Sequence, residues 1–155
     1  MNNIDEVLKK YGLTMPQPPK VAGIYEPVKE FGDNFCFLSG CIPCFDGVMC
    51  MTGKLGKEIN VEQGQEAARM CALNLIANLQ LKYGSLEKIK RIVKITVFVA
   101  GTDTFYDHPK VANGASQLFI DIFGEEIGRG ARSAIGVNAL PLNAPVEIEM
   151  LVELN

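Results

Sequence analysis

The stretch Asn60–Ala100, NVEQGQEAARMCALNLIANLQLKYGSLEKIKRIVKITVFVA, places a long amphipathic helix directly before a strand. The Asn60 side chain can cap the exposed amides of the first turn, and Gln63 stands at the capping-box position. Apolar residues then recur at every fourth position: Ala67, Cys71, Leu75 and Leu79. We therefore predict one helix over residues 61–83, packed by one face and ended by Gly84.

The residues that follow predict a buried strand and a second helix. Residues 91–100 are β-branched and apolar, which is typical of a buried strand, and a short capped turn over Ser85–Lys90 precedes them. Asp107 and Pro109 mark a second helix start, and Gly124 marks its end.

The C-terminal part continues with a loop and two strands. Glu125–Gly130 is polar and rich in glycine, which favours a loop. Arg132–Val137 and Val146–Leu154 are predicted as the last two strands, because apolar residues alternate with Glu147 and Glu149 in the second of them.

The N-terminal part divides into an appendage and the start of the domain. Residues 1–20 hold apolar positions at helical spacing and then a proline-rich connector, whereas residues 21–155 form the domain itself. The sequence predicts further strands, with a turn at Gly32-Asp33-Asn34. These strands are Val21–Tyr25, Phe35–Ser39 and Val48–Met51.

This order, β-β-β-α-β-α-β-β, predicts an α+β fold with a mixed six-stranded sheet. Two long helices cannot cover both faces of such a sheet, so we expect both on one face. The other face would be apolar and open, which predicts burial against further copies of the chain.

Bulk composition narrows the function classes. A chain of 155 residues with 48% hydrophobic and 21% charged residues suits one folded domain. A net charge of −3 gives no electrostatic footprint for nucleic acid, so nucleic-acid binding is not favoured. The N-terminus lacks the basic and apolar regions of a signal peptide, and no segment suits a membrane span, so we expect a soluble cytoplasmic protein.

Several short motifs occur in a fixed order along residues 21–154. They are Gly23-Ile24-Tyr25, Ser39-Gly40 followed by Ile42-Pro43, Thr96–Val99, Val111–Gly114, Phe119–Gly124, Gly130–Ile135, Leu140-Pro141 and Val146–Glu149. The ordered set resembles the YjgF/Rid (reactive-intermediate deaminase, endoribonuclease L-PSP-like) family. That resemblance implies a chorismate-mutase-like fold and a homotrimer with sites in the clefts between subunits.

The resemblance also implies a reaction and its residues. The family's activity is hydrolysis of 2-imino acids and their enamine tautomers to 2-keto acids and ammonia, without a cofactor. Arg132 matches the arginine that grips the substrate carboxylate through two parallel hydrogen bonds, and Glu147 matches a carboxylate that orients water or carries protons. Other positions match the family pocket: Tyr25, Ser39, Asn113, Ala134 and Ile135.

Departures from the family pattern leave alternative functions open. Ala134 stands where members of the deaminase branch commonly carry Cys, and the lead-in Gly130-Ala131 lacks their proline. One alternative is a non-catalytic trimer that binds small carboxylates or partner proteins. A ribonuclease or translation inhibitor is less favoured, because His108 is the only histidine and is expected to be solvated. Arg132 could also serve only as a structural ion-pair partner of Glu147 or Glu149.

The cysteines predict reduced thiols. Five cysteines in a chain without a signal peptide argue against a disulfide framework. Cys41-Ile42-Pro43-Cys44 has the spacing of a redox pair, but a predicted turn follows it where a redox motif would open a helix. No other Cys or His has zinc-site spacing to it, so no metal site is expected.

Overall fold

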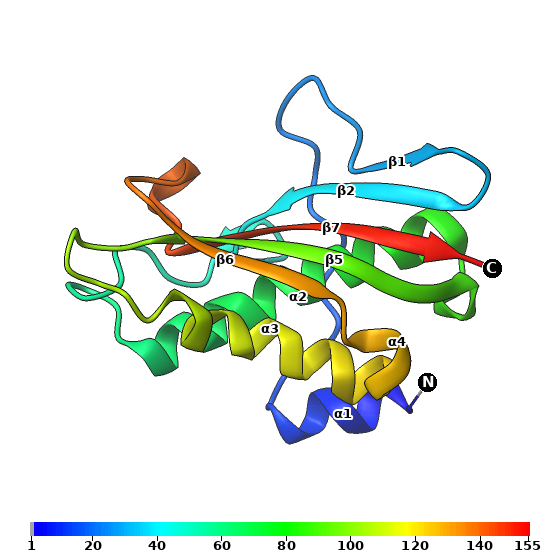
Figure 1. The fold of residues 1–155 in the computed structure, drawn as a ribbon, viewed down its shortest axis with the longest axis horizontal. Helices are drawn as coiled ribbons and strands as arrows, with labels where there is room; N and C mark the ends of the chain where they lie inside the picture. Colours follow the sequence, from blue (N-terminus) through cyan, green and yellow to red (C-terminus); the bar gives the residue numbers. More distant parts are fainter. Residues whose placement is uncertain (1) are drawn as a thin grey trace.

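The computed structural model describes residues 2–155 and has a five-stranded sheet with its long helices beneath it (Figure 1). The strands lie side by side in the order β1 (Val28–Phe31), β2 (Phe35–Cys41), β7 (Val146–Leu154), β5 (Ile89–Ala100) and β6 (Ala131–Val137). Only the β5–β6 pair is parallel. The helices are α1 (Ile4–Lys10), α2 (Val61–Tyr83), α3 (His108–Phe123) and the single turn α4 (Glu125–Gly128). The predicted α+β class and mixed sheet are confirmed.

Local capping fixes the bounds of α2 where the sequence predicted them. Gln63 N–H donates to Asn60 Oδ1 at 2.9 Å, and Asn60 N–H donates to Gln63 Oε1 at 3.0 Å. At the other end, Gly84 has the left-handed φ of 74° that a helix-ending glycine provides. Ser85 caps the following 3₁₀ turn, Leu86–Lys88, which leads into β5.

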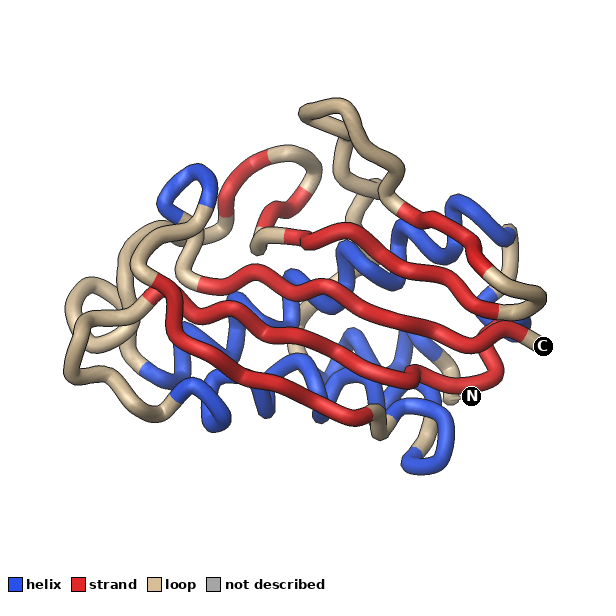
Figure 2. Tube along the Cα trace, turned by 45° about the horizontal axis from the view of Figure 1, so that its top comes forward, coloured by secondary structure: helices blue, strands red, loops and turns tan. Residues whose placement is uncertain are grey.

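The core lies between the sheet and the two long helices. In the β5–β7 pair, Val97 stands opposite Ile148, and both are fully buried on the face of the sheet that α2 and α3 cover. Because successive side chains of a strand point to opposite faces, every second residue of these strands faces away from the helices. Figure 2 shows the long helices gathered on one side of the sheet, as predicted.

The other face of the sheet is open and partly aromatic. Phe31 stacks with Phe35 at 5.7 Å and with Phe37 at 5.8 Å between ring centroids. Phe37 is 48% exposed on β2, and Ile135 is 44% exposed on β6. This apolar surface follows from placing two helices on one face only.

The predicted strand over Val21–Tyr25 is wrong. These residues form an irregular loop in which Ile24 is fully exposed and Tyr25 is 49% exposed. The strand begins later, because the turn at Gly32 (φ 59°) joins β1 directly to β2 and sets Phe31 opposite Phe35. A two-stranded hairpin needs its first strand immediately before its turn.

The predicted six-stranded sheet is also wrong, because residues 48–51 do not join it. They contribute β4 (Val48–Met49), which pairs with β3 (Cys44–Phe45) in a separate hairpin. Asp46 and Gly47 form its two-residue turn with φ values of 48° and 85°. Two positive φ angles are what such a tight hairpin requires, and Asp-Gly supplies them readily.

The predicted loop over Glu125–Gly130 begins instead with the helical turn α4. Glu125 and Glu126 occupy its first turn, where negative charge offsets the helix dipole, and Arg129 forms an ion pair with Glu125. Gly128 lies directly against the backbone of Phe119 in α3. Its lack of a side chain permits this contact, so here glycine serves packing and not loop flexibility.

Helix α1 packs on the rest of the molecule. Val7 and Leu8 are buried in the common core, and Asn2 N–H donates to the Ile122 carbonyl at 2.8 Å. The Tyr11 hydroxyl donates to Asp121 Oδ2 at 2.5 Å. These contacts hold α1 against α3.

Among residues 2–155, no helix has both the length and the apolar composition needed to cross a bilayer.

The crossing of α2 and α3 at Gly114 gives a stability prediction. A Cβ at Gly114 would overlap the backbone carbonyl of Gln65, which cannot move without distorting α2. Although alanine is the better helix former, we expect Gly114→Ala to lower the free energy of unfolding by about 1–3 kcal/mol in urea titrations. The control is Gly23→Ala, whose Cβ would meet only the Tyr25 ring at 3.4 Å. Equal stability of Gly114→Ala and wild type would contradict the close crossing.

Candidate functional site

Arg132 lies on β6, the edge strand next to β5, and its side chain reaches toward α3. It stands opposite Ile95, whose side chain is buried on the helix-covered face. One terminal nitrogen, Nη1, donates to Asn113 Oδ1 at 2.8 Å and to Ser116 Oγ at 3.0 Å. These neutral partners hold the guanidinium and leave its other N–H donors available to a ligand.

The simplest structural role for Arg132 does not apply in this chain. Among residues 2–155, Arg132 forms no ion pair with any carboxylate, including Glu147 and Glu149. An arginine that is oriented and not neutralised is suited to bind a carboxylate ligand through its planar fork of donors.

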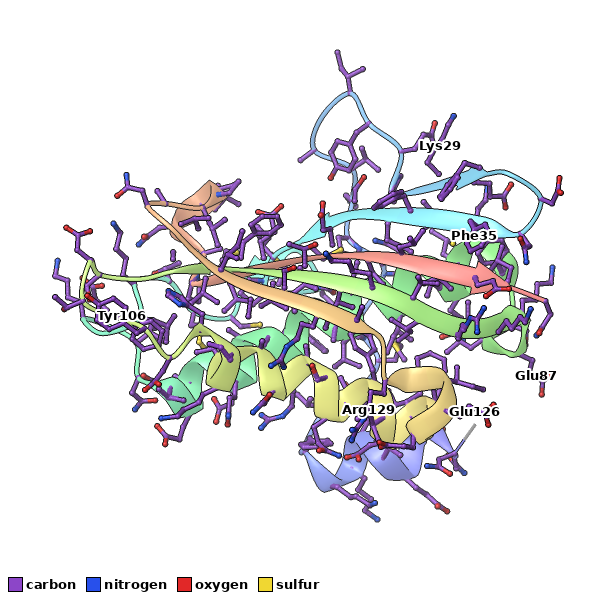
Figure 3. All side chains as sticks on the ribbon, in the orientation of Figure 1. Lys29, Phe35, Glu87, Tyr106, Glu126 and Arg129 are labelled. Carbon is purple, nitrogen blue, oxygen red and sulfur yellow. The ribbon has the colours of Figure 1, made fainter. Side chains whose placement is uncertain are left out.

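A groove of about 590 Å³ opens beside Arg132. Residues from α2, α3, α4, β5 and β6 contribute to its walls, together with Tyr11 just after α1. The polar side chains among them are chiefly Tyr11, Gln65, Arg69, Asn113, Ser116 and Arg132. In Figure 3 the labelled Arg129, which also lines the groove, lies beside α4 and above α1. The groove is therefore polar and basic, and its volume is that of a small-molecule site.

A second group of predicted residues lies elsewhere on the chain. Tyr25 and Ser39 line a separate cavity of about 580 Å³ between the residue 17–27 loop and the end of β2. The Ser39 hydroxyl donates to the Glu26 carbonyl at 2.7 Å, which ties the loop to β2. The β2–β7 register slips between Leu38 and Cys41, so Ser39 and Gly40 form a β-bulge.

Glu147 lies against this bulge and on the open face of the sheet. A side chain at Gly40 would collide with the Glu147 carboxylate, so the glycine makes room for it. Burial, reinforced by the charge of Glu149, raises the pKa of Glu147 above its usual value. A carboxyl group of this kind can exchange protons closer to neutral pH than an exposed one.

The candidate residues therefore form two groups within one chain. Arg132 and Asn113 lie together on the helix side of the β6 edge, whereas Glu147 stands opposite Phe98 and faces away from the helices. Ala134 shares the face of Arg132 and packs against the core, whereas Ile135 points to the open face. One chain does not bring Arg132 and Glu147 together.

Sequence reasoning missed several residues of the groove. Ser116 was detectable, because a residue three positions after Asn113 lies on the same side of a helix. Tyr11 and Arg69 carried no such signal. They join the site because α1 and α2 pack around α3.

The Cys41–Cys44 pair does not have the properties of a redox site. Burial, with the nearby Glu147 carboxylate, raises the pKa of Cys41 to about 12, and burial also raises the pKa of Cys44. Both thiols therefore stay protonated at neutral pH, whereas reactive cysteines need a lowered pKa. Within the described part of the chain, no three His, Cys, Asp or Glu side chains converge as metal ligands would.

His108 is partly buried, which corrects the expectation of a solvated side chain. Its ring packs edge-on against Phe105 at 5.3 Å, and it lies close above Gly136. It lines a different cavity from the one beside Arg132.

The order of motifs and the fold agree with comparisons to known proteins. The family model described as "YjgF/chorismate mutase-like, putative endoribonuclease" matches residues 5–154. The chain belongs to this family. It is 49% identical over 148 residues to Protein TCP17 of Trypanosoma cruzi. The match covers 96% of this chain and 92% of TCP17. A RutC family protein of Aquifex aeolicus is 31% identical over 136 residues, or 88% of this chain and 93% of its own length.

Solved structures of the YjgF family divide by similarity to this chain. A protein of unknown function from Agrobacterium tumefaciens superposes with a TM-score of 0.89 at 39% identity, covering 98% of this chain and 92% of its own. A "putative endoribonuclease" from Shewanella oneidensis superposes with a TM-score of 0.90 at 33% identity, covering 99% of this chain and 100% of its own. A "putative endoribonuclease" from Thermotoga maritima superposes with a TM-score of 0.64 at 28% identity, covering 90% of this chain and 93% of its own. The first two therefore share this chain's geometry much more closely than the third.

The raised pKa of Glu147 predicts how stability depends on pH. A pKa that is raised in the folded state means that the folded state binds the proton more tightly than the unfolded state does. The pKa of a glutamate in the unfolded chain is about 4.3. As pH rises from this value through the folded pKa, Glu147 ionises and the free energy of unfolding falls. We expect Glu147→Gln to raise Tm at pH 7.5 and to raise it less at pH 4. Glu66→Gln, at an exposed position of α2, should change Tm little at either pH. A Tm below wild type for Glu147→Gln at pH 7.5 would contradict this account.

Proposed function

We propose that the chain is a homotrimeric, cofactor-independent hydrolase that converts 2-imino acids and their enamine tautomers to 2-keto acids and ammonia. The observation that carries this proposal is the Arg132 guanidinium. Two neutral side chains orient it, and no carboxylate among residues 2–155 neutralises it. A 2-imino acid presents a carboxylate next to its reactive carbon, so an arginine that holds the carboxylate also positions that carbon.

The proposed trimer completes the site. Arg132 and Glu147 lie on opposite faces of one sheet, and the open face is apolar enough to need a cover. A neighbouring copy whose open face abuts the β6 edge would bring its own Glu147, Tyr25 and Ser39 toward Arg132 of the first chain. Supporting this arrangement, β6 is an edge strand and Ile135 on it is exposed.

The chemistry requires one water and one proton carrier. Water adds to the carbon of the protonated imine and gives up a proton to the Glu147 carboxylate, which leaves a neutral tetrahedral aminoalcohol. Glu147 then returns that proton to nitrogen, the carbon–nitrogen bond breaks, and ammonia leaves. The carbonyl forms as the hydroxyl group gives its proton to the Glu147 carboxylate, which later releases it to ammonia or solvent. The raised pKa of Glu147 supports both halves of this transfer, since the group must accept and release a proton near neutral pH.

A second candidate is a non-catalytic trimer that binds small carboxylates. Ala134 favours it, because the commonly found cysteine of the deaminase branch is missing beside Arg132. Ribonuclease activity, which the family description names, has less support, because the only histidine packs against Phe105 away from the Arg132 groove. Free thiols such as Cys50 suit action in the cytoplasm.

An imine-trapping assay tests the proposal. An amino-acid oxidase generates 2-imino acids in situ, semicarbazide traps them, and an active protein lowers the yield of trapped product. We expect Arg132→Ala to lose between about 10-fold and about 150-fold in kcat/KM, because a hydrogen bond to a charged group contributes about 1.5–3 kcal/mol. Arg132→Lys keeps the positive charge but lacks the planar pair of donors, so its activity should lie between that of wild type and that of Arg132→Ala.

Arg91→Ala is the matched control for loss of an arginine. Arg91 lies on β5 and pairs with Glu153, which keeps Lys90 as a second partner. Its activity should equal that of wild type. If wild-type protein does not suppress trapping of any 2-imino acid, the deaminase proposal fails and carboxylate binding takes its place.

Light scattering after size-exclusion chromatography tests the assembly. We expect three times the mass of one chain for wild type. Phe37→Asp places a charge in the aromatic cluster of the open face and should yield a smaller species. Leu81→Asp is the control, because Leu81 is 73% exposed on α2, on the opposite side of the sheet. A wild-type monomer would overturn the intersubunit site.

A further inference from the structure

The groove beside Arg132 contains more positive charge than one carboxylate requires. Three of the four arginines of the chain line it, namely Arg69, Arg129 and Arg132, and no Asp or Glu is among its lining residues. The fourth arginine, Arg91, pairs with Glu153. The arginine side chains are therefore concentrated at one place on an acidic protein.

Arg69 is held in the groove by an aromatic ring and not by a carboxylate. Its guanidinium carbon lies 4.9 Å from the centre of the Tyr11 ring, and the residue is half-buried on α2. Among residues 2–155 it forms no ion pair. Cation–π contact orients a guanidinium and leaves its charge free to bind an anion.

The acidic side chain beside Tyr11 is already engaged. Asp121 accepts from the Tyr11 hydroxyl through Oδ2 and from Gln117 Nε2 through Oδ1 at 2.8 Å. Burial and the bond to Asp121 raise the pKa of Tyr11 to about 12, so the phenol remains a donor at neutral pH. Tyr11 is thus fixed in place, and its ring in turn fixes Arg69.

Arg129 differs from the other two arginines. It pairs with Glu125, and both side chains are mostly exposed. The groove therefore has two oriented arginines that lack a counter-ion, Arg69 from α2 and Arg132 from β6. A single carboxylate fills only a small part of about 590 Å³, so there is room for a second anionic group.

We propose that this groove selects small dianions: 2-imino or 2-keto acids whose side chain ends in a second anionic group, which Arg69 binds. This inference rests on the proposed role of Arg132 as the site of the first carboxylate. It names a substrate class with an acidic side chain, and it assigns to Arg69 a part in specificity.

Titration calorimetry with two matched keto acids tests the inference. 2-Oxoglutarate and 2-oxopentanoate have the same carbon chain, and only the first has a second carboxylate. Wild type should bind 2-oxoglutarate at least about tenfold more tightly, as one charge-assisted contact provides. Arg69→Gln should abolish this preference and leave the affinity for 2-oxopentanoate unchanged, whereas Arg132→Ala should weaken binding of both.

Further arms separate the remaining possibilities. 3-Phosphoglycerate tests whether the second anion is a phosphate: tighter binding than 2-oxoglutarate that depends on Arg69 keeps the dianion site and assigns it to phosphate. Arg91→Gln, which removes an arginine outside the groove that pairs with Glu153, should keep the preference. A preference that survives Arg69→Gln, no preference in wild type, or a changed oligomeric mass in Arg69→Gln would overturn the inference.

The dianion inference and the deaminase proposal can fail separately. Binding of 2-oxoglutarate that depends on Arg69, without imine hydrolysis, would support the dianion site and reject the enzyme. Imine hydrolysis that requires Arg132 but does not depend on a second carboxylate or on Arg69 would support the enzyme and reject the dianion site.

Discussion

The parallel pairing of β5 with β6 is the constraint from which the site follows. Two parallel neighbours cannot be joined by a tight turn, so the chain between them must cross the sheet, and α3 with α4 makes that crossing. The crossing places Asn113 and Ser116 beneath Arg132 on the returning strand. The orientation of the guanidinium is thus a result of topology, and the close α2–α3 contact at Gly114 keeps the crossing helix in position.

The same topology creates an imbalance between the two faces of the sheet. Both long helices cover one face, and the other keeps Phe31, Phe37 and Ile135 partly in water. A surface of this kind marks a contact with another molecule, and another copy of the chain is the cover that we propose. The two groups of candidate residues fit that view, because each is incomplete alone: one has a free cation, and the other has a carboxyl group with a raised pKa.

The charged side chains fall into two kinds of cluster, one in which the charges are paired and one in which positive charges lack a counter-ion. The chain is acidic overall, yet three of its four arginines converge on one groove. Glu153 is buried and is satisfied by Lys90 and Arg91, so this cluster is structural. Arg69 and Arg132 are held by a tyrosine ring and by neutral oxygens instead. This difference between neutralised and merely oriented cations is why we assign a stabilising role to the Glu153 cluster and propose ligand binding for the groove.

The sequence by itself determined what depends on neighbours along the chain. The bounds of α2 follow from the Asn60–Gln63 box and Gly84, the hairpin at Asp46-Gly47 follows from turn chemistry, and the ordered motifs around Arg132 indicated the family. Only the tertiary structure decided which strands share a sheet, since pairing joins segments far apart and Val21–Tyr25 finds no partner. It also decided that Arg132 and Glu147 lie on opposite faces, and that Arg69 and Tyr11 join the groove. These features depend on how helices pack around α3, and no local pattern encodes that packing.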